Sequence, residues 1–119
     1  MIKVVNKNSH TPTDKDIYIG RGSVLGNPYT GTKELSKTKA IFQCNSRTES
    51  IEKYEIYLRD KISNSDPDIM KILSEIEIKS LNGEVNLVCF CKPKKCHGDI
   101  IKQIIEGRLI KNAMNKIKN

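Results

Sequence analysis

Hydrophobic positions along the chain fall into short β-branched runs and longer stretches with helical spacing. The runs at 2–7, 17–20 and 84–91 predict three strands. The last run is almost continuously apolar from Leu87 to Cys91, which is typical of a strand covered on both faces. Residues 30–45 show no clear period, and we expect them to form a loop.

Two helices are predicted between the second and third strands. Ser46 and Glu49 make a capping-box pattern at the start of 46–62. In 65–78, Asp66 is placed to cap a helix whose first residue is Pro67, and Gly83 offers a left-handed turn after it. The expected core-facing positions are Ile51, Tyr54, Leu58 and Ile62 in the first helix and Ile69, Ile72, Leu73 and Ile76 in the second.

A third helix is predicted over 98–107, followed by a further helical segment from Leu109 onwards. We expect Gly107 to end the first of these, whose inward positions are Ile100, Ile101, Ile104 and Ile105. Strands that alternate with helices favour an α/β layer fold with a small, mostly parallel sheet. At 119 residues the chain is expected to form one domain over 1–119.

Composition and charge indicate the cellular compartment and the class of partner that the protein is expected to have. No apolar run is long enough to cross a bilayer and the first ten residues lack a signal-peptide centre, so we expect a cytoplasmic protein without membrane contacts. The net charge is +7, with basic residues in excess over 1–45 and 84–119 and acidic ones over 46–83. This basic protein suits a phosphate-bearing partner, although lysines kept for solubility would give the same charge. With no tryptophan and six other aromatic residues, it offers few platforms for stacking single-stranded nucleic acid.

A glycine-rich loop, IGRGSVLGNP at 19–28, follows the second predicted strand. Glycines allow backbone N–H groups to approach an anion closely, and the guanidinium of Arg21 suits a carboxylate or phosphate. The loop matches neither the dinucleotide fingerprint nor the P-loop, because Asn27-Pro28 keeps the chain extended where those motifs open a helix. A tight turn without a ligand is the competing interpretation.

The stretch VCFCKPKKCHGD at 88–99 gathers three of the four cysteines. In a reducing compartment such a cluster favours metal or thiol chemistry over disulfides. Cys89, Cys91, Cys96 and His97 are ligand types that zinc accepts, and Cys89 and Cys91 would project to one side of a strand. The spacing departs from that of zinc knuckles, so the hypotheses of bound zinc and of no cofactor both stay open.

A second hypothesis gives the same stretch a catalytic role. A Cys96 thiol at a helix N-terminus would have a lowered pKa, His97 would serve as acid or base, and Asp99 would orient it. The alternative is structural: Cys89 and Cys91 as small core residues and Asp99 as a helix cap.

Three ordered motifs, YIGRGSVLGNPY, SRTESIEKYEIYL and LVCFCKPKKCHGD, give the chain a resemblance to a family of bacteria and their viruses, domain of unknown function 4326. The resemblance covers roughly residues 16–108, with Phe90 where tryptophan is common. The cysteine-histidine step is also similar to that of a second uncharacterised family with a Rossmann-like fold. Together they imply a small three-layer Rossmann-like domain and, for a viral copy, the host cytoplasm; neither implies a reaction. The matching positions are Gly20, Arg21, Gly26, Asn27, Pro28, Arg47, Tyr54, Cys89, Cys91, Cys96, His97 and Asp99.

We therefore expect a pocket that binds a nucleotide-like or phosphorylated small molecule and sequesters or processes it. Carboxyl ends of parallel strands gather ligands, and both unusual stretches follow strands. The expected ligand-binding residues are Gly20, Arg21, Gly22, Gly26, Asn27, Pro28 and Arg47, facing the helix start at Cys96–Asp99. The alternatives are a nucleoside- or nucleotide-directed hydrolase or transferase using Cys96, His97 and Asp99, and a zinc-stabilised adaptor that binds nucleic acid.

Overall fold

A three-stranded parallel sheet forms the centre of the computed structural model, which describes residues 1–30, 42–43, 46–90 and 96–118. Its strands are β1 (Ile2–Asn6), β2 (Asp16–Tyr18) and β5 (Val85–Cys89), in the order β1-β5-β2. Ile2 lies opposite Val85 on one side of β5, and Tyr18 lies opposite Val88 on the other. The predicted α/β class with a parallel sheet is confirmed.

The last of the described strands, β5, occupies the middle because its composition tolerates burial on both faces. All five residues of β5 are buried. Val85, Leu87 and Cys89 belong to the main core together with alternate residues of β1 and β2, so the residues between them point to the opposite side. We call that opposite side the helix-free face, because the irregular connection 7–15 covers it where a Rossmann-like fold has helices.

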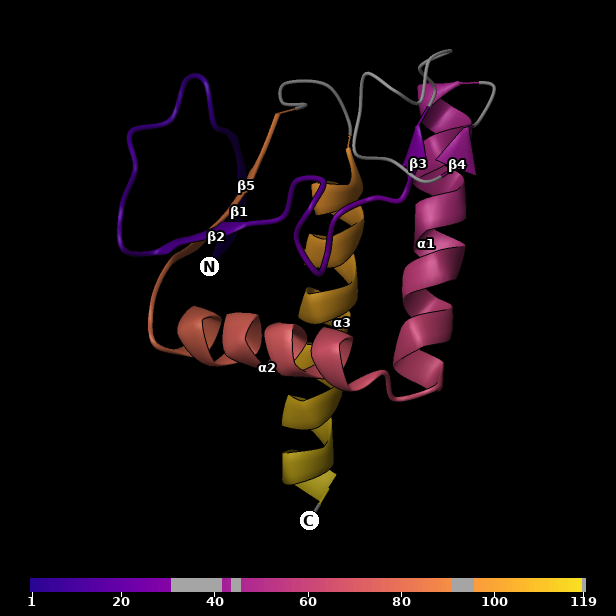
Figure 1. The fold of residues 1–119 in the computed structure, drawn as a ribbon. Coiled ribbons are helices and arrows are strands. Elements are labelled where there is room, and N and C mark those ends of the chain that lie inside the picture. The colour runs from indigo at the N-terminus through magenta and orange to yellow at the C-terminus, as the bar shows by residue number, and fades with distance from the viewer. Residues whose placement is uncertain (31–41, 44–45, 91–95, 119) are drawn as a thin grey trace.

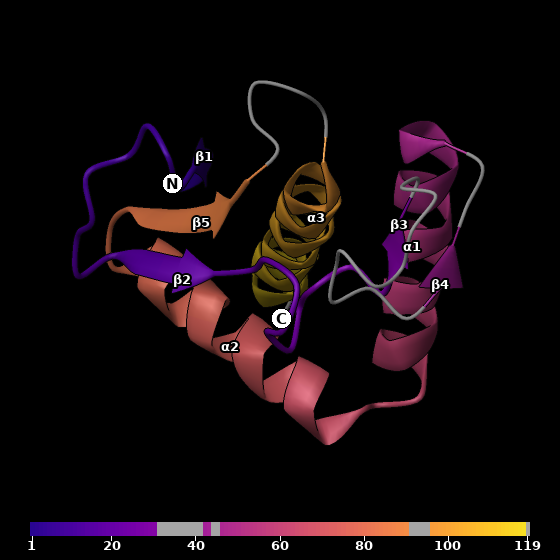
Figure 2. The same ribbon diagram turned by 45° about the horizontal axis from the view of Figure 1, so that its top comes forward.

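In the part of the chain that the structure describes, three helices pack on the other side. They are α1 (Arg47–Ser63), α2 (Pro67–Leu81) and α3 (His97–Lys118). Ser46 accepts the Glu49 N–H and Asp66 accepts the Ile69 N–H, so both predicted caps are confirmed. Gly83 has the expected positive φ, at 151°. Figures 1 and 2 show α3 standing between the sheet and α1, with α2 passing beneath the sheet.

The apolar stripes predicted for the helices all face this core. Buried positions come from every helix: Ile51, Tyr54 and Leu58 of α1, Ile69, Leu73 and Ile76 of α2, and Ile100, Ile101, Ile104 and Ile105 of α3. None of the helices in the described part of the chain has the length and apolar character needed to cross a bilayer. That residues 1–119 form a single domain stays a prediction.

Two predictions about boundaries are wrong. The helix does not end at Gly107, because α3 continues to Lys118 without a break. A glycine inside a helix costs only about 1 kcal/mol relative to alanine, and Leu109 still packs against the core beyond it. The loop predicted over 30–45 is wrong for its described residues, because Tyr29–Thr30 (β3) and Phe42–Gln43 (β4) form a second, two-stranded parallel sheet beside α1. The rest of that prediction, 31–41 and 44–45, lies outside the described residues.

Candidate functional site at the carboxyl edge of the sheet

Parallel pairing brings the two unusual sequence stretches to one end of the sheet, which we call the carboxyl edge. The loop Gly20–Pro28 leaves β2 there, and α3 begins there after β5. His97 joins them directly: its Nε2 donates to the carbonyl oxygen of Ile19 at 2.5 Å. Since that oxygen can only accept, the Nε2 atom carries a proton.

The glycine loop is folded back on its own backbone. The backbone N–H and the hydroxyl of Ser23 both donate to the carbonyl of Gly20, at 3.1 and 2.6 Å, and the Gly26 N–H donates to the Ser23 carbonyl at 3.0 Å. Gly22, with φ at 95°, makes the left-handed step of this turn. Pro28 is half-buried and leads into β3.

Two buried side chains attach the loop to α1. The Asn27 amide donates to the Ser50 hydroxyl at 2.9 Å, and the Tyr54 hydroxyl donates to the Leu25 carbonyl at 2.6 Å. Burial raises the pKa of Tyr54 well above its ordinary value, so it stays a neutral donor. Asn27, predicted to contact a ligand, therefore has a partner within the protein.

Two arginines predicted to bind the ligand lie at this end of the molecule. Arg21 is half-buried, and its Nε donates to the Asn27 carbonyl at 3.2 Å. Arg47 is the first residue of α1 and is exposed, one turn before Ser50. The chain thus places cationic groups on both segments that the Asn27–Ser50 hydrogen bond holds together.

The start of α3 is packed rather than open. Asp99 accepts the Cys96 N–H at 3.0 Å and donates its own N–H to the Cys96 carbonyl at 3.1 Å, which makes it a cap. The His97 ring packs edge-on against Tyr54, with 5.1 Å between centroids. His97 is only 6% exposed and Cys96 only 1%. A nucleophile or an acid must reach its substrate, so this burial favours the structural interpretation of both residues.

The thiols of Cys89 and Cys96 lie 3.5 Å apart in the core. Cys91, the third predicted sulfur ligand, lies outside the described residues, and His97 uses its Nε2 atom on Ile19. Within the described ranges, His, Cys, Asp and Glu nowhere gather in a group of three or more that could hold a metal ion. The described part of the predicted zinc set thus provides two adjacent thiols.

Sequence reasoning missed an exposed group at the same edge, which we call the aromatic platform: Lys7, Tyr18 and Phe90. The Tyr18 and Phe90 rings meet edge-to-face with 6.2 Å between centroids, and they are 42% and 51% exposed. The Lys7 ammonium lies 5.5 and 5.6 Å from the two centroids. The available signal was strand alternation, since each ring follows a core-facing residue at the end of its strand.

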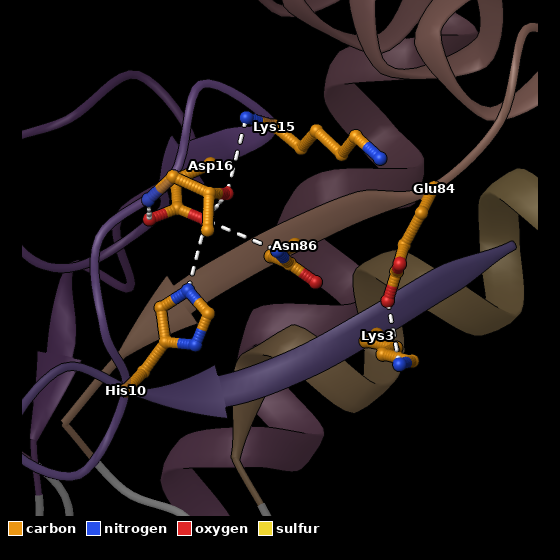
Figure 3. Close-up of polar contacts among 7 residues, drawn as sticks. Lys3, His10, Lys15, Asp16, Glu84 and Asn86 are labelled. Atoms are coloured by element: carbon orange, nitrogen blue, oxygen red, sulfur yellow. Dashed lines mark hydrogen bonds and ion pairs between the residues drawn. The ribbon is translucent and has the colours of Figure 1, made fainter.

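A second polar cluster lies at the opposite, amino end of the sheet (Figure 3). Asp16 accepts from His10 at 2.9 Å, from Asn86 at 3.1 Å and from the N–H and hydroxyl of Thr13 at 3.0 and 2.9 Å. Partial burial would raise the pKa of Asp16, but these hydrogen bonds outweigh it and hold the pKa far below its ordinary value. This cluster fastens the connection 7–15 to the sheet and lies away from the predicted site.

Comparisons with known proteins extend the sequence evidence. The family model described as Domain of unknown function (DUF4326) matches residues 2–107. A protein of Enterobacteria phage T4, named "Uncharacterized 12.4 kDa protein in nrdA-td intergenic region", is 33% identical over 112 residues, covering 94% of this chain and 83% of the relative. No solved structure matches the chain.

Proposed function

The chain belongs to the family described as domain of unknown function DUF4326, and because that description carries no activity, we propose a function from the geometry of the carboxyl edge. We infer that this edge binds a nucleotide-like or otherwise phosphorylated small molecule. The supporting observation is the hydrogen bond from His97 to Ile19, which joins the glycine loop to the start of α3. In parallel α/β sheets, ligands gather at this end.

The phosphate is assigned to the loop side of the edge, because Asp99 already complements the start of α3. A carboxylate that accepts the Cys96 N–H neutralises the positive end of the helix and would repel an anion placed there. Arg21 on the loop and Arg47 at the start of α1 supply cationic groups on the two segments that the Asn27–Ser50 hydrogen bond joins. Arg21 is the primary phosphate contact in this proposal, and Arg47 assists.

Asn27 takes a positioning role in this proposal. Its side chain holds Ser50 and its carbonyl accepts from Arg21, so it connects the loop arginine to the first turn of α1. A preorganised arginine loses less conformational freedom on binding than a mobile one, which favours affinity.

The Arg21→Ala variant tests this function. A panel of mono-, di- and trinucleotides and cyclic nucleotides is measured by thermal shift, and ligands that raise the melting temperature are titrated by calorimetry. Loss of a charge-assisted hydrogen bond of about 1.5–3 kcal/mol predicts a roughly 10- to 150-fold weaker affinity.

Arg59→Ala is the matched control, because it removes an equally charged, exposed side chain from α1 that pairs with Glu55. This variant is expected to bind like the wild type. If Arg21→Ala keeps wild-type affinity for every ligand that binds, the proposed phosphate contact is wrong. If nothing in the panel binds the wild-type protein, the proposed function itself fails.

The two alternative functions have less support. A hydrolase or transferase using Cys96, His97 and Asp99 would need the first two to reach a substrate, and both are buried. A zinc-stabilised nucleic-acid adaptor would need a ligand set, of which the described residues supply only adjacent thiols. Turnover that disappears in a Cys96→Ala variant would support the hydrolase or transferase. Stoichiometric zinc in the purified protein would support the zinc-stabilised adaptor.

A further inference from the structure

The aromatic platform lies beside the loop on which the proposed phosphate contact depends. We propose that Lys7, Tyr18 and Phe90 form the base-binding part of the site, so that the ligand is a nucleotide and its base stacks on the exposed rings. This inference rests on the proposed function and adds the chemical class of the ligand to it.

The three side chains share one surface because of strand alternation. Ile17, Ile19 and Cys89 point into the core, so Tyr18 and Phe90 project from the helix-free face. Lys7 follows β1 in the same alternation, and its N–H extends the ladder to the Cys89 carbonyl at 2.8 Å. Residues from the ends of all three parallel strands therefore meet at one place, the carboxyl edge.

Tyr18 is held in position although half of its surface is exposed. Its hydroxyl donates to the Arg21 carbonyl at 3.3 Å, and its ring lies across Gly20, where a Cβ atom would collide with the ring. This bond also links the aromatic platform to the residue that carries the proposed phosphate contact. A ring that is already fixed contacts a ligand at little cost in side-chain entropy.

Phe90 is positioned through its backbone. The Asn6 amide donates to the Phe90 carbonyl at 3.3 Å, which ties the residue to the end of β1. Large apolar side chains exposed next to each other cost solvation energy unless something covers them, and here both rings stand beside an ammonium. A planar base bearing a phosphate matches the rings through stacking and the cations through charge.

The scale of the platform favours one base over a nucleic-acid strand. A binding groove for single strands repeats its stacking rings along the backbone. Among the described side chains, the remaining aromatic residues are Tyr54, which is buried, and Tyr57, which is half-buried on α1 and packs against Tyr54. The platform therefore accommodates a mononucleotide.

The test compares three probes by calorimetry: AMP, ribose 5-phosphate and adenosine. Stacking of one base contributes a factor on the order of 10 to 100 in affinity, so AMP is expected to bind the wild-type protein that much more tightly than ribose 5-phosphate. Phe90→Ala is expected to remove this advantage and to leave the affinity for ribose 5-phosphate unchanged. Arg21→Ala is expected to weaken both phosphate-bearing probes.

Two further variants separate stacking from simple apolar contact and from general damage. Phe90→Leu keeps apolar surface but has no ring, and it is expected to lose most of the advantage of AMP. Ile56→Ala removes an exposed apolar side chain from α1 and is expected to change nothing. The melting temperature of each variant, measured without ligand, establishes that it is folded.

The outcomes distinguish the two proposals. Equal affinities for AMP and ribose 5-phosphate, or a Phe90→Ala variant that keeps the difference, overturn the base site while the phosphate site stands. Adenosine and AMP binding equally, with loss in Phe90→Ala, support the base site and contradict the phosphate site. If an oligothymidylate binds and none of the three probes does, the ligand is nucleic acid and the mononucleotide proposal is wrong. If nothing binds, the base site and the phosphate site are both wrong.

Discussion

Close approach between the start of α3 and the sheet controls which residues fit there. A Cβ atom on Gly98 would lie 2.7 Å from Val4 Cγ1 and 2.9 Å from Ile19 Cδ1, both atoms of the core side of the sheet. Gly98 thus lets α3 pack tightly enough for His97 to reach the Ile19 carbonyl. The same helix contains Gly107, where a Cβ atom would meet nothing within 4 Å.

These two glycines give a prediction with opposite signs. Gly98→Ala is expected to lower the free energy of unfolding by about 1–3 kcal/mol, because the added methyl group overpacks the core. Gly107→Ala is expected to raise it by about 0.5–1 kcal/mol, because alanine loses less backbone entropy in a helix. Urea denaturation of the two variants measures both changes. A stabilised Gly98→Ala variant would contradict the close packing.

For single residues, the sequence predicted which side chains lie at the site better than it predicted what each of them contacts. Arg21 and Asn27 were predicted to contact a ligand and His97 to act in catalysis or bind zinc, and all three lie at the carboxyl edge. The partners of Asn27 and His97, however, lie 23 and 78 residues away along the chain. No local pattern encodes such contacts, because they depend on the tertiary arrangement.

Among the elements, the connection 7–15 is unusual in lacking any helix between two parallel strands. Its attachment depends on hydrogen bonds to one carboxylate, Asp16, from His10 and Thr13. The carboxylate also accepts from Asn86 in the central strand. Side-chain hydrogen bonds therefore do here what apolar packing does for the helices.

This attachment predicts a pH-dependent stability. The lowered pKa of Asp16 means that its contribution is present in full above the unfolded-state value, near 3.8, and is lost as the pH falls towards the folded-state value. Asp16→Asn is expected to lower the urea midpoint at pH 7, and its difference from the wild type is expected to shrink at pH 3. Denaturation curves at the two pH values measure this.

Asp14→Asn is the control, since it removes the same charge from an exposed position in the same connection. It is expected to leave the urea midpoint within error at pH 7. A deficit of Asp16→Asn that is equal at pH 7 and pH 3 would show that the carboxylate charge does not stabilise the connection.

Elements with strong local signals were predictable, and those without were not. The bounds of α1 and α2 were predictable to within a few residues, because both helices have an apolar stripe and a capping residue, Ser46 or Asp66. The predicted helix end at Gly107 was wrong because a single glycine weakens a helix without ending it when packing continues beyond it. The two-residue strands β3 and β4 are too short to have a period and are stabilised by their mutual pairing and by α1.

For the whole molecule, the strand order gives β5 a special position. β1 and β2 each pair with β5 and not with one another, although they are adjacent in sequence. The central element of the sheet is thus the last of the described strands. The interleaving of strands and helices predicted the class of the fold, but strand order depends on long-range pairing that no local stretch determines.

This order predicts that a fragment of residues 1–83 does not form the sheet. Without Val85–Cys89, neither N-terminal strand has a partner and the core loses one of its walls. Amide signals of residues 2–18 in two-dimensional NMR are expected at random-coil positions, whereas those of the full chain are dispersed. Dispersed, slowly exchanging amides for this segment in the fragment would contradict the topology.

The position of β5 also has a consequence for biosynthesis. The ribosome releases Tyr18 long before Cys89, and at about 5–20 residues per second the interval between them is roughly 4 to 14 s. During that time the segments that become β1 and β2 lack the strand with which they pair, and unpaired strands are prone to associate with other chains. The sheet can therefore form only after Val85–Cys89 has emerged and taken its place between β1 and β2.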